Sequence, residues 1–158
     1  MGTVTAGMVQ RRAPIFNTSL ESGVRTLSLL VAAHPAGFDV QQLAFFDYLL
    51  VHSGDVPGGP ESLHPATPHR SGEFLVRRQL VEQGVRVLMS RGLVDRVLDV
   101  DGITYRASES AASILCSLSS SYSSKLRSRA QWVVERFGKQ SERAIAEFFA
   151  ANLDRWGG

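Results

Sequence analysis

Apolar residues recur every three to four positions in the first third of the chain, which predicts two amphipathic helices. The first helix is capped by Asn17 or Ser19 and runs to about Ala33, where the segment His34-Pro35-Ala36-Gly37 ends it. Asp39 caps the second helix, which runs to about Ser53 and has Gly54 as its C-terminal stop. The apolar stripe predicted for the first helix consists of Leu20, Val24, Leu27, Leu30 and Val31.

The pattern changes after the second helix. Residues 54–71 contain Pro57, Pro60, Pro65 and Pro68, which predicts an ordered or ligand-binding loop rather than a helix or strand. A third helix is expected over residues 72–91, closed by Gly92. Residues 93–100 and 103–107 then read as two strands joined at Asp101-Gly102. Three helices followed by a hairpin predict a winged helix.

The remaining residues predict further helices. Ser108 is expected to cap a fourth helix, which crosses the serine-rich residues 117–124 and continues or restarts to about Gly138, and Ser141 is expected to cap a last helix. The serines would form one solvated face of this long or kinked helix. The predicted fold is therefore mainly α with a small β-hairpin, a winged helix-turn-helix domain followed by C-terminal helices. Its parts are a flexible tail over 1–14, the winged-helix domain over 15–107 with the inserted loop 54–71, and a helical extension over 108–158.

Two charged residues fall in the middle of apolar helix faces. Asp47 lies among the apolar residues of the second helix, and Arg77 lies at the centre of a third-helix face formed by Val76, Leu80, Val87 and Leu88. Because an unpaired buried charge is strongly destabilising, we predict an ion pair between Asp47 and Arg77. The alternative is that each finds another partner or reaches solvent. Gly84 would let a neighbouring helix approach closely.

The second helix also has a second apolar side, which contains Phe45 and Leu49. Two apolar sides require two neighbours, and the second neighbour is either the C-terminal helices or another protein. Our predicted partner-contact residues on and around the 54–71 loop are Phe45, Tyr48, His52, Asp55, Glu61, His64, Arg70 and Arg78.

Charge argues against sequence-specific reading of DNA by the third helix. Its outer face offers Leu75, Gln79, Glu82, Gln83, Arg86 and Ser90, and the hairpin carries Asp95, Asp99 and Asp101 beside Arg96 and Arg106. A second candidate surface for nucleic acid or an acidic partner is a stripe on a later helix, formed by Lys125, Arg129, Trp132 and Arg136. Such stripes are otherwise solvated faces or protein contacts.

Composition narrows the class of protein further. The chain has 17 Lys+Arg against 15 Asp+Glu, a net charge of +2, which is not the coat of a general phosphate-backbone binder. Cys116 is the single cysteine, so it forms no internal disulfide, and its neighbours Ile114 and Leu115 suggest that it is buried. The chain has no apolar run of membrane-spanning length, and a reducing cytoplasm is the expected location.

The sequence carries no recognisable enzyme signature. His52, Asp55, His64 and His69 match no established metal-ligand spacing, although a metal-dependent hydrolase using the first three would be one alternative function. Neither a Gly-x-Ser-x-Gly motif nor a phosphate-binding Gly-rich loop followed by Lys-Ser/Thr is present. We expect no catalytic residue, no metal and no cofactor.

A set of short motifs, in order along residues 17–156, resembles one protein family. The motifs are residues 47–55 (DYLLVHSGD), 61–65 (ESLHP), 70–73 (RSGE), 76–78 (VRR), 91–93 (RGL) and 129–132 (RAQW). They resemble the middle component 2 family of bacterial ABC-three-component systems.

The resemblance implies a small winged-helix protein encoded between an effector and an SMC-like ABC ATPase, in operons that act in defence against phages and mobile DNA. Such a protein would link the ATPase to the effector and would not be catalytic. It could also associate with itself, and it would contact DNA only within the complex. The rival function is a winged-helix transcription regulator, which predicts strongly salt-dependent, sequence-selective DNA binding by the isolated protein.

Overall fold

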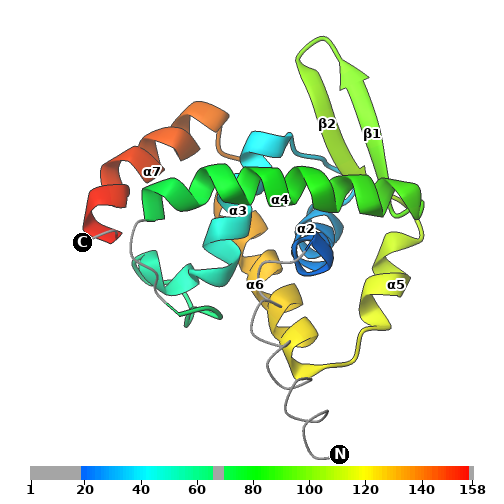
Figure 1. The fold of residues 1–158 in the computed structure, drawn as a ribbon, viewed down its shortest axis with the longest axis horizontal. Coiled ribbons are helices and arrows are strands. Elements are labelled where there is room, and N and C mark those ends of the chain that lie inside the picture. Colours follow the sequence, from blue (N-terminus) through cyan, green and yellow to red (C-terminus); the bar gives the residue numbers. More distant parts are fainter. Residues whose placement is uncertain (1–18, 66–69, 157–158) are drawn as a thin grey trace, which may run out of the picture.

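A long helix, α4 (Arg70–Ser90), lies across two earlier helices, α2 (Ser19–Ala33) and α3 (Val40–Val51), in the computed structural model, which describes residues 19–65 and 70–156 (Figure 1). An antiparallel hairpin of β1 (Val94–Asp99) and β2 (Gly102–Ala107) follows α4 and projects from the helical body. Three helices complete the described chain: α5 (Ala111–Cys116), α6 (Ser121–Phe137) and α7 (Glu142–Trp156).

The prediction of a mainly α fold with a small β-hairpin is confirmed. The finer winged-helix arrangement and the division into a domain and an extension stay predictions. The predicted tail over 1–14, and Asn17 as a cap, lie outside the described residues.

Asp39 begins α3 as predicted. Its carboxylate accepts a hydrogen bond from the backbone N–H of Gln42 at 2.7 Å, and the Gln42 side chain accepts one from the backbone N–H of Asp39 at 2.9 Å. This reciprocal capping box satisfies two backbone donors that the first turn of a helix leaves open.

Gly54 does not end the helix as predicted. The helix stops at Val51, His52 is its cap, and a 3-10 turn, η2 (Ser53–Asp55), continues the chain. The backbone N–H of Gly54 instead donates to the Ser62 hydroxyl at 2.9 Å. Gly54 therefore connects the start of the loop to Ser62 and does not terminate the helix.

Close packing of α2 against α4 depends on two glycines. A Cβ atom added to Gly84 would lie 3.0 Å from the backbone nitrogen of Gly23, whereas one added to Gly23 would lie 3.9 Å from the Gly84 carbonyl oxygen. The close approach predicted at Gly84 is thus present, and its partner is the backbone of α2.

This asymmetry predicts opposite effects of two substitutions. Gly84→Leu should lower the free energy of unfolding by about 1–3 kcal/mol, because the added atoms push the two helices apart. Gly23→Ala should be neutral or stabilise by up to about 1 kcal/mol, since it fits without overlap and restricts the unfolded chain. Urea denaturation measures both, and a Gly84→Leu protein as stable as the wild type would contradict the tight crossing.

The hairpin turns one residue earlier than predicted. Asp99 pairs with Gly102, so Val100 and Asp101 form the two-residue turn and Gly102, at φ +126°, begins β2. A positive φ is accessible to glycine because it lacks a Cβ atom. The sequence prediction placed the turn at Asp101-Gly102, the pair with the strongest turn preference, whereas in the structure Gly102 already pairs with Asp99.

The base of the hairpin is fastened to the segment before α3. Phe38 donates its backbone N–H to the Tyr105 carbonyl at 2.9 Å, and Tyr105 donates to the Phe38 carbonyl at 2.8 Å. Periodicity gave no sign of this one-residue bridge.

The serine-rich segment breaks the predicted long helix into α5 and α6, in agreement with the kinked or restarted alternative. The Ser120 side chain caps α6 by accepting from the Ser123 backbone N–H at 3.1 Å. Arg127 donates to the Leu118 carbonyl at 3.1 Å and so holds the turn before α6. The predicted cap at Ser108 is wrong, because α5 begins at Ala111 after Ser110.

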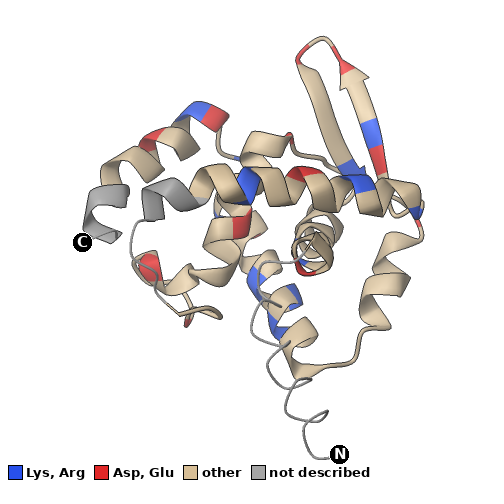
Figure 2. Ribbon diagram, in the orientation of Figure 1, with Lys and Arg blue, Asp and Glu red and all other residues tan. Residues whose placement is uncertain are grey.

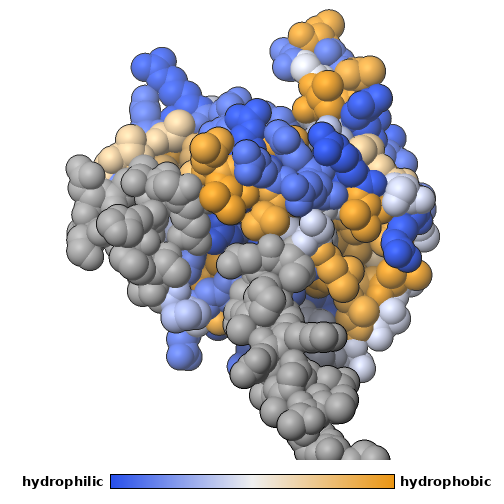
Figure 3. Space-filling model, viewed as in Figure 1, coloured by the Kyte–Doolittle hydropathy of each residue, from blue (hydrophilic) through white to orange (hydrophobic). Residues whose placement is uncertain are grey.

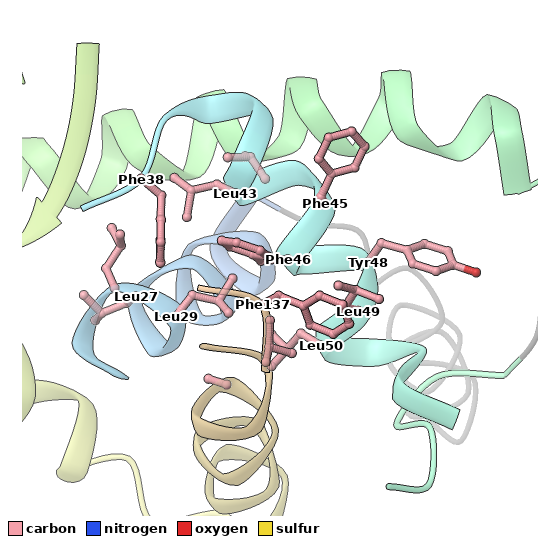
Figure 4. Packing of buried hydrophobic residues seen from close by; sticks show 14 of the residues in the cluster. Leu27, Leu29, Phe38, Leu43, Phe45, Phe46, Tyr48, Leu49, Leu50 and Phe137 are labelled. Atoms are coloured by element: carbon pink, nitrogen blue, oxygen red, sulfur yellow. The ribbon is translucent and has the colours of Figure 1, made fainter. Parts of the chain in front are cut away.

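The core lies on both sides of α3. Figure 4 shows Leu43, Phe46, Leu49 and Leu50 directed toward residues such as Leu29 of α2 and Phe137 of α6, while Phe45 and Tyr48 point another way. The second side is covered by α4 and α7: the Phe45 ring stacks on Phe149 with centroids 4.6 Å apart and contacts Phe74 at 5.7 Å. Of the two neighbours considered for this side, the C-terminal helices are thus the one present.

Three residues expected in the core are exposed instead. Leu20 is 73% exposed and Val76 is 54% exposed, and Cys116 also lies on the surface. The buried side of α4 runs through Arg77, Val81, Gly84, Val85 and Leu88, which rotates Val76 toward solvent. Cys116 is the last residue of the short helix α5, whose buried residues are Ala111 and Leu115.

Candidate functional site

Asp47 lies at the centre of a buried ionic network. It is fully buried in α3 and contacts two arginines, one on each of the neighbouring helices. Arg77 of α4 forms the predicted ion pair through Nη1 and Asp47 Oδ2. Arg25 of α2 donates from Nε to Asp47 Oδ1 at 2.7 Å. One carboxylate thereby joins α2, α3 and α4.

Arg25 was missed by the sequence prediction. It lies beside the apolar stripe of the first helix rather than within it, and is nevertheless only 1% exposed. The available signal was that Arg25 is the single basic residue of that helix, and that a buried carboxylate has two oxygens to satisfy.

The pKa values of the network follow from this arrangement. Burial acts to raise the pKa of Asp47, but the positive charges of Arg25 and Arg77 outweigh burial and hold that pKa below its ordinary value. Burial acts to lower the pKa of Arg25, and the Asp47 carboxylate outweighs it, so the pKa of Arg25 is raised. Asp47 and Arg25 are therefore charged at neutral pH.

A second set of hydrogen bonds extends the network to α6 and the loop. Arg25 Nη1 lies 3.4 Å from Glu21 Oε1, and the Tyr122 hydroxyl donates to the same Glu21 oxygen at 2.8 Å. His64 Nε2 lies 2.7 Å from the Tyr122 hydroxyl oxygen. Since Tyr122 donates its one proton to Glu21, His64 donates through Nε2–H. Burial, and after it the hydrogen bond and charge of Glu21, raise the pKa of Tyr122.

His64 is neutral in the folded protein at physiological pH. Burial, with the positive charge of Arg25 as the next cause, lowers its pKa to about 4 from 6.5. In the unfolded chain His64 keeps its ordinary pKa, so between about pH 4 and 6.5 the unfolded state binds the extra proton.

The free energy of unfolding should therefore rise with pH from about 4 to 6.5 through His64. His64→Gln, which keeps an N–H donor without a titrating group, should show a shallower rise over this window when urea midpoints are measured at several pH values. His34→Gln, at a 37% exposed histidine, is the control. Identical pH profiles for wild type and His64→Gln would contradict a half-buried His64 that is neutral in the folded protein.

The described part of the loop after α3, residues 54–65, is held by hydrogen bonds near both of its ends. The backbone N–H groups of Leu63 and His64 both donate to the Val51 carbonyl, at 2.9 and 3.0 Å, and Ser53 Oγ donates to the Glu61 carbonyl at 3.1 Å. Tyr48 donates its hydroxyl to Asp55 at 2.5 Å. The loop is therefore packed against the end of α3 over the described residues 54–65, as the structured-loop prediction required.

Burial corrects part of the predicted partner-contact set. Phe45 is 8% exposed, Tyr48 is 0% exposed and His52 is 2% exposed, because α7 and α4 cover that side of α3. These three side chains belong to the core and are not available to a partner in this conformation. The sequence showed that the face was apolar but not which element covers it.

The other predicted contact residues lie at or near the surface. Glu61 and Arg78 are exposed, while Asp55 and His64 are half-buried. Arg78 donates to Gln41 at 2.9 Å and lies 3.5 Å from Glu82. The position of the Arg70 side chain lies outside the description, although Arg70 begins α4.

The four residues of the predicted basic stripe on α6 differ in exposure: two pack against the loop and two are exposed to solvent. Arg129 Nε donates to the Glu61 carbonyl at 3.1 Å, and Trp132 is half-buried against the loop, where a Cβ atom on Gly59 would lie 3.1 Å from its ring. Lys125 and Arg136 are exposed. Two of the four residues thus hold the loop onto α6.

The histidines near the loop have separate structural partners. His52 packs on the Tyr48 ring at 4.7 Å between centroids, and His64 binds Tyr122. Within residues 19–65 and 70–156, no group of three or more His, Cys, Asp or Glu residues is placed to hold a metal ion. His69, the remaining member of the candidate metal set, lies outside this part of the chain.

An apolar groove of about 320 Å³ opens between α2, α4 and α5. Its walls include the exposed side chains of Leu20, Ile114 and Leu118, and Arg91 lies at its border. Arg86, predicted on the outer face of the third helix, is exposed.

Comparison with known protein families gives a match over nearly the whole chain. The model of a family described as the ABC-three component (ABC-3C) system Middle Component 2 matches residues 15–158. No curated protein and no solved structure matches the chain. No helix in the described part of the chain is long and apolar enough to cross a membrane.

Proposed function

Because the chain belongs to the Middle Component 2 family of ABC-three component systems, we propose that it is a non-catalytic adaptor within such a system. It links an SMC-like ABC ATPase to an effector protein, in a cytoplasmic complex that defends a prokaryote against phages and mobile DNA. The family establishes a component role. The linking role, the partners and the defence function are our proposal.

The observation that most supports an adaptor is that, within the described residues, Asp47, His64 and Asp55 each have a structural partner. Asp47 forms ion pairs with Arg25 and Arg77. His64 is hydrogen-bonded to Tyr122, and Asp55 accepts a hydrogen bond from the Tyr48 hydroxyl. A general acid or base is usually poised near the working pH and within reach of substrate. His64 has a pKa of about 4 and its Nε2 is directed at Tyr122, which suits a structural role.

The fold supports a platform for partner proteins. Three helices followed by a projecting hairpin match the order of a winged helix, which we include in the proposal. The network around Asp47 holds the three helices in fixed relation, and the loop is pinned to α3 and α6. Rigid elements of this kind present a docking surface at low entropic cost.

The surface that would read DNA in a winged helix is poorly suited to it. The outer face of α4 places Glu82 beside Arg86, and the hairpin tip carries Asp99 and Asp101. Carboxylates at this position repel the phosphate backbone. The adaptor is therefore favoured over a transcription regulator, and the experiment below distinguishes the two.

Co-expression with the ATPase and effector genes of the same operon tests the proposal. Size-exclusion chromatography with light scattering should show the chain eluting in one complex with both proteins. A second measurement is DNA binding by the isolated chain, which should bind duplex DNA weakly and without sequence preference.

A chain that elutes alone and binds one DNA sequence with steep salt dependence would overturn the adaptor and support the regulator. Complex formation with only one of the two proteins would overturn the linking role while leaving the component role intact.

A further inference from the structure

The tip of the β1–β2 hairpin, defined here as residues 98–103, is an exposed apolar knob. Leu98 is 69% exposed, Val100 is 101% exposed and Ile103 is 44% exposed. Figure 3 shows hydrophobic residues on the hairpin where it projects from the body. These side chains contribute little to the core, so folding alone does not account for them.

The register shows how the knob arises. Leu98 pairs with Ile103, and Val94 pairs with Ala107 at the base. Because side chains alternate between the two faces of a strand, all four residues lie on the same face. Val94 and Ala107 are buried in the core, the pair of Arg96 and Tyr105 follows on the same face, and Leu98 and Ile103 lie beyond that pair, away from the body.

The turn itself adds a third apolar side chain. Val100 and Asp101 form the two-residue turn, and such turns favour Asn, Asp and Gly. Valine has no conformational advantage there and is fully exposed. Apolar side chains gathered at an exposed site are typical of an interaction surface.

The charges around the knob define the kind of partner. Asp99 and Asp101 border it, and Arg96 and Arg106 lie nearer the body together with Asp95, all of them exposed. Figure 2 shows acidic residues at the tip of the hairpin and residues of both signs nearer the body. Acidic side chains at the most distant point disfavour phosphate and favour a cationic border. We propose that the hairpin tip inserts into an apolar pocket bordered by Lys or Arg side chains on a protein partner within the system. This proposal rests on the proposed function and names the docking element it uses.

A double variant of the tip tests the proposal without disturbing the fold. Leu98→Ser combined with Val100→Asn removes two exposed side chains, so the thermal unfolding midpoint should stay at the wild-type value. Affinity for the co-expressed ATPase or effector should fall about tenfold or more, the usual effect of losing buried apolar anchors. Leu75→Ser on α4 is the matched control, since Leu75 is 68% exposed, and it should bind as the wild type does.

Salt-dependent binding and photo-crosslinking provide two further tests. Asp99→Asn with Asp101→Asn should weaken binding at low salt and reduce its dependence on ionic strength. A photo-crosslinking amino acid at position 100 should crosslink to the ATPase or the effector.

Each outcome separates the two hypotheses. A complex that forms normally with the tip variants, or crosslinking of position 100 to DNA, overturns the docking proposal and leaves the adaptor function standing. If wild-type protein forms no complex at all, the adaptor function and the docking proposal both fail.

Discussion

Replacing Asp47 with asparagine is expected to lower the free energy of unfolding by about 3–5 kcal/mol, because two guanidinium groups lose their buried counter-charge. Asp47 is 0% exposed, and Arg25 and Arg77 are 1% and 5% exposed, so water cannot take its place without opening the core. Against a typical total of about 5–15 kcal/mol, this loss should leave much of the protein unfolded at 37 °C. Urea or thermal denaturation followed by circular dichroism measures it.

The matched control is a surface ion pair of similar length. Arg143 Nε lies 3.0 Å from Glu147 Oε1, with the two side chains 89% and 67% exposed. Glu147→Gln should change the free energy of unfolding by less than about 0.5 kcal/mol. A further variant, Arg25→Met with Asp47→Leu and Arg77→Met, removes all three charges and should recover part of the stability lost in Asp47→Asn. An Asp47→Asn protein within about 1 kcal/mol of wild type would contradict the buried network.

Replacing Phe149 with alanine is expected to cost about 3–5 kcal/mol and to release α7 from the body. Phe149 is 2% exposed and its ring lies 4.6 Å from Phe45 and 4.9 Å from Phe74, measured between centroids. The substitution leaves a cavity where α7 meets α3 and α4, and aromatic pairs add about 0.5–1.5 kcal/mol each beyond the buried area.

Hydrogen exchange distinguishes local release from global loss of stability. In Phe149→Ala, amides of α7 should exchange faster than those of α2. The half-buried neighbour Phe148 provides the control, and Phe148→Ala should cost less. Unchanged exchange in α7 would show that the aromatic cluster does not hold this helix.

Because α4 and α7 cover the side of α3 that carries Phe45 and Tyr48, that side is not available to a partner protein. Phe45 and Tyr48 looked like contact residues because the sequence placed them on an apolar face away from the predicted core. Burial by α4 and α7 removes them from the surface. The hairpin tip and the exposed part of the loop around Glu61 then become the places where we expect protein contacts.

Local signals in the sequence determined most of the elements. Asp39 with Gln42 forms a capping box within four residues, and Gly92 ends α4 with φ +70°, a conformation that suits glycine. Both depend on nearby residues alone. The serine-rich break was harder to place, because the local serine caps and the apolar spacing that continues through them pointed to different helices.

One long-range contact was also predictable from the sequence. Asp47 and Arg77 each interrupt an apolar face, and the cost of burying either charge alone leaves few arrangements other than a pair. That argument could identify the pair but not the third member, since Arg25 does not lie within the apolar stripe of its helix.

The sequence by itself thus determined the helices, the hairpin and the need for a buried ion pair, because caps, turns and periodicity act over a few residues. Only the tertiary structure decided that Arg25 completes the network, that α7 covers Phe45, and that Phe38 pairs with Tyr105. These contacts depend on the angle and rotation at which helices pack, which are fixed by the fit of many side chains distant in sequence.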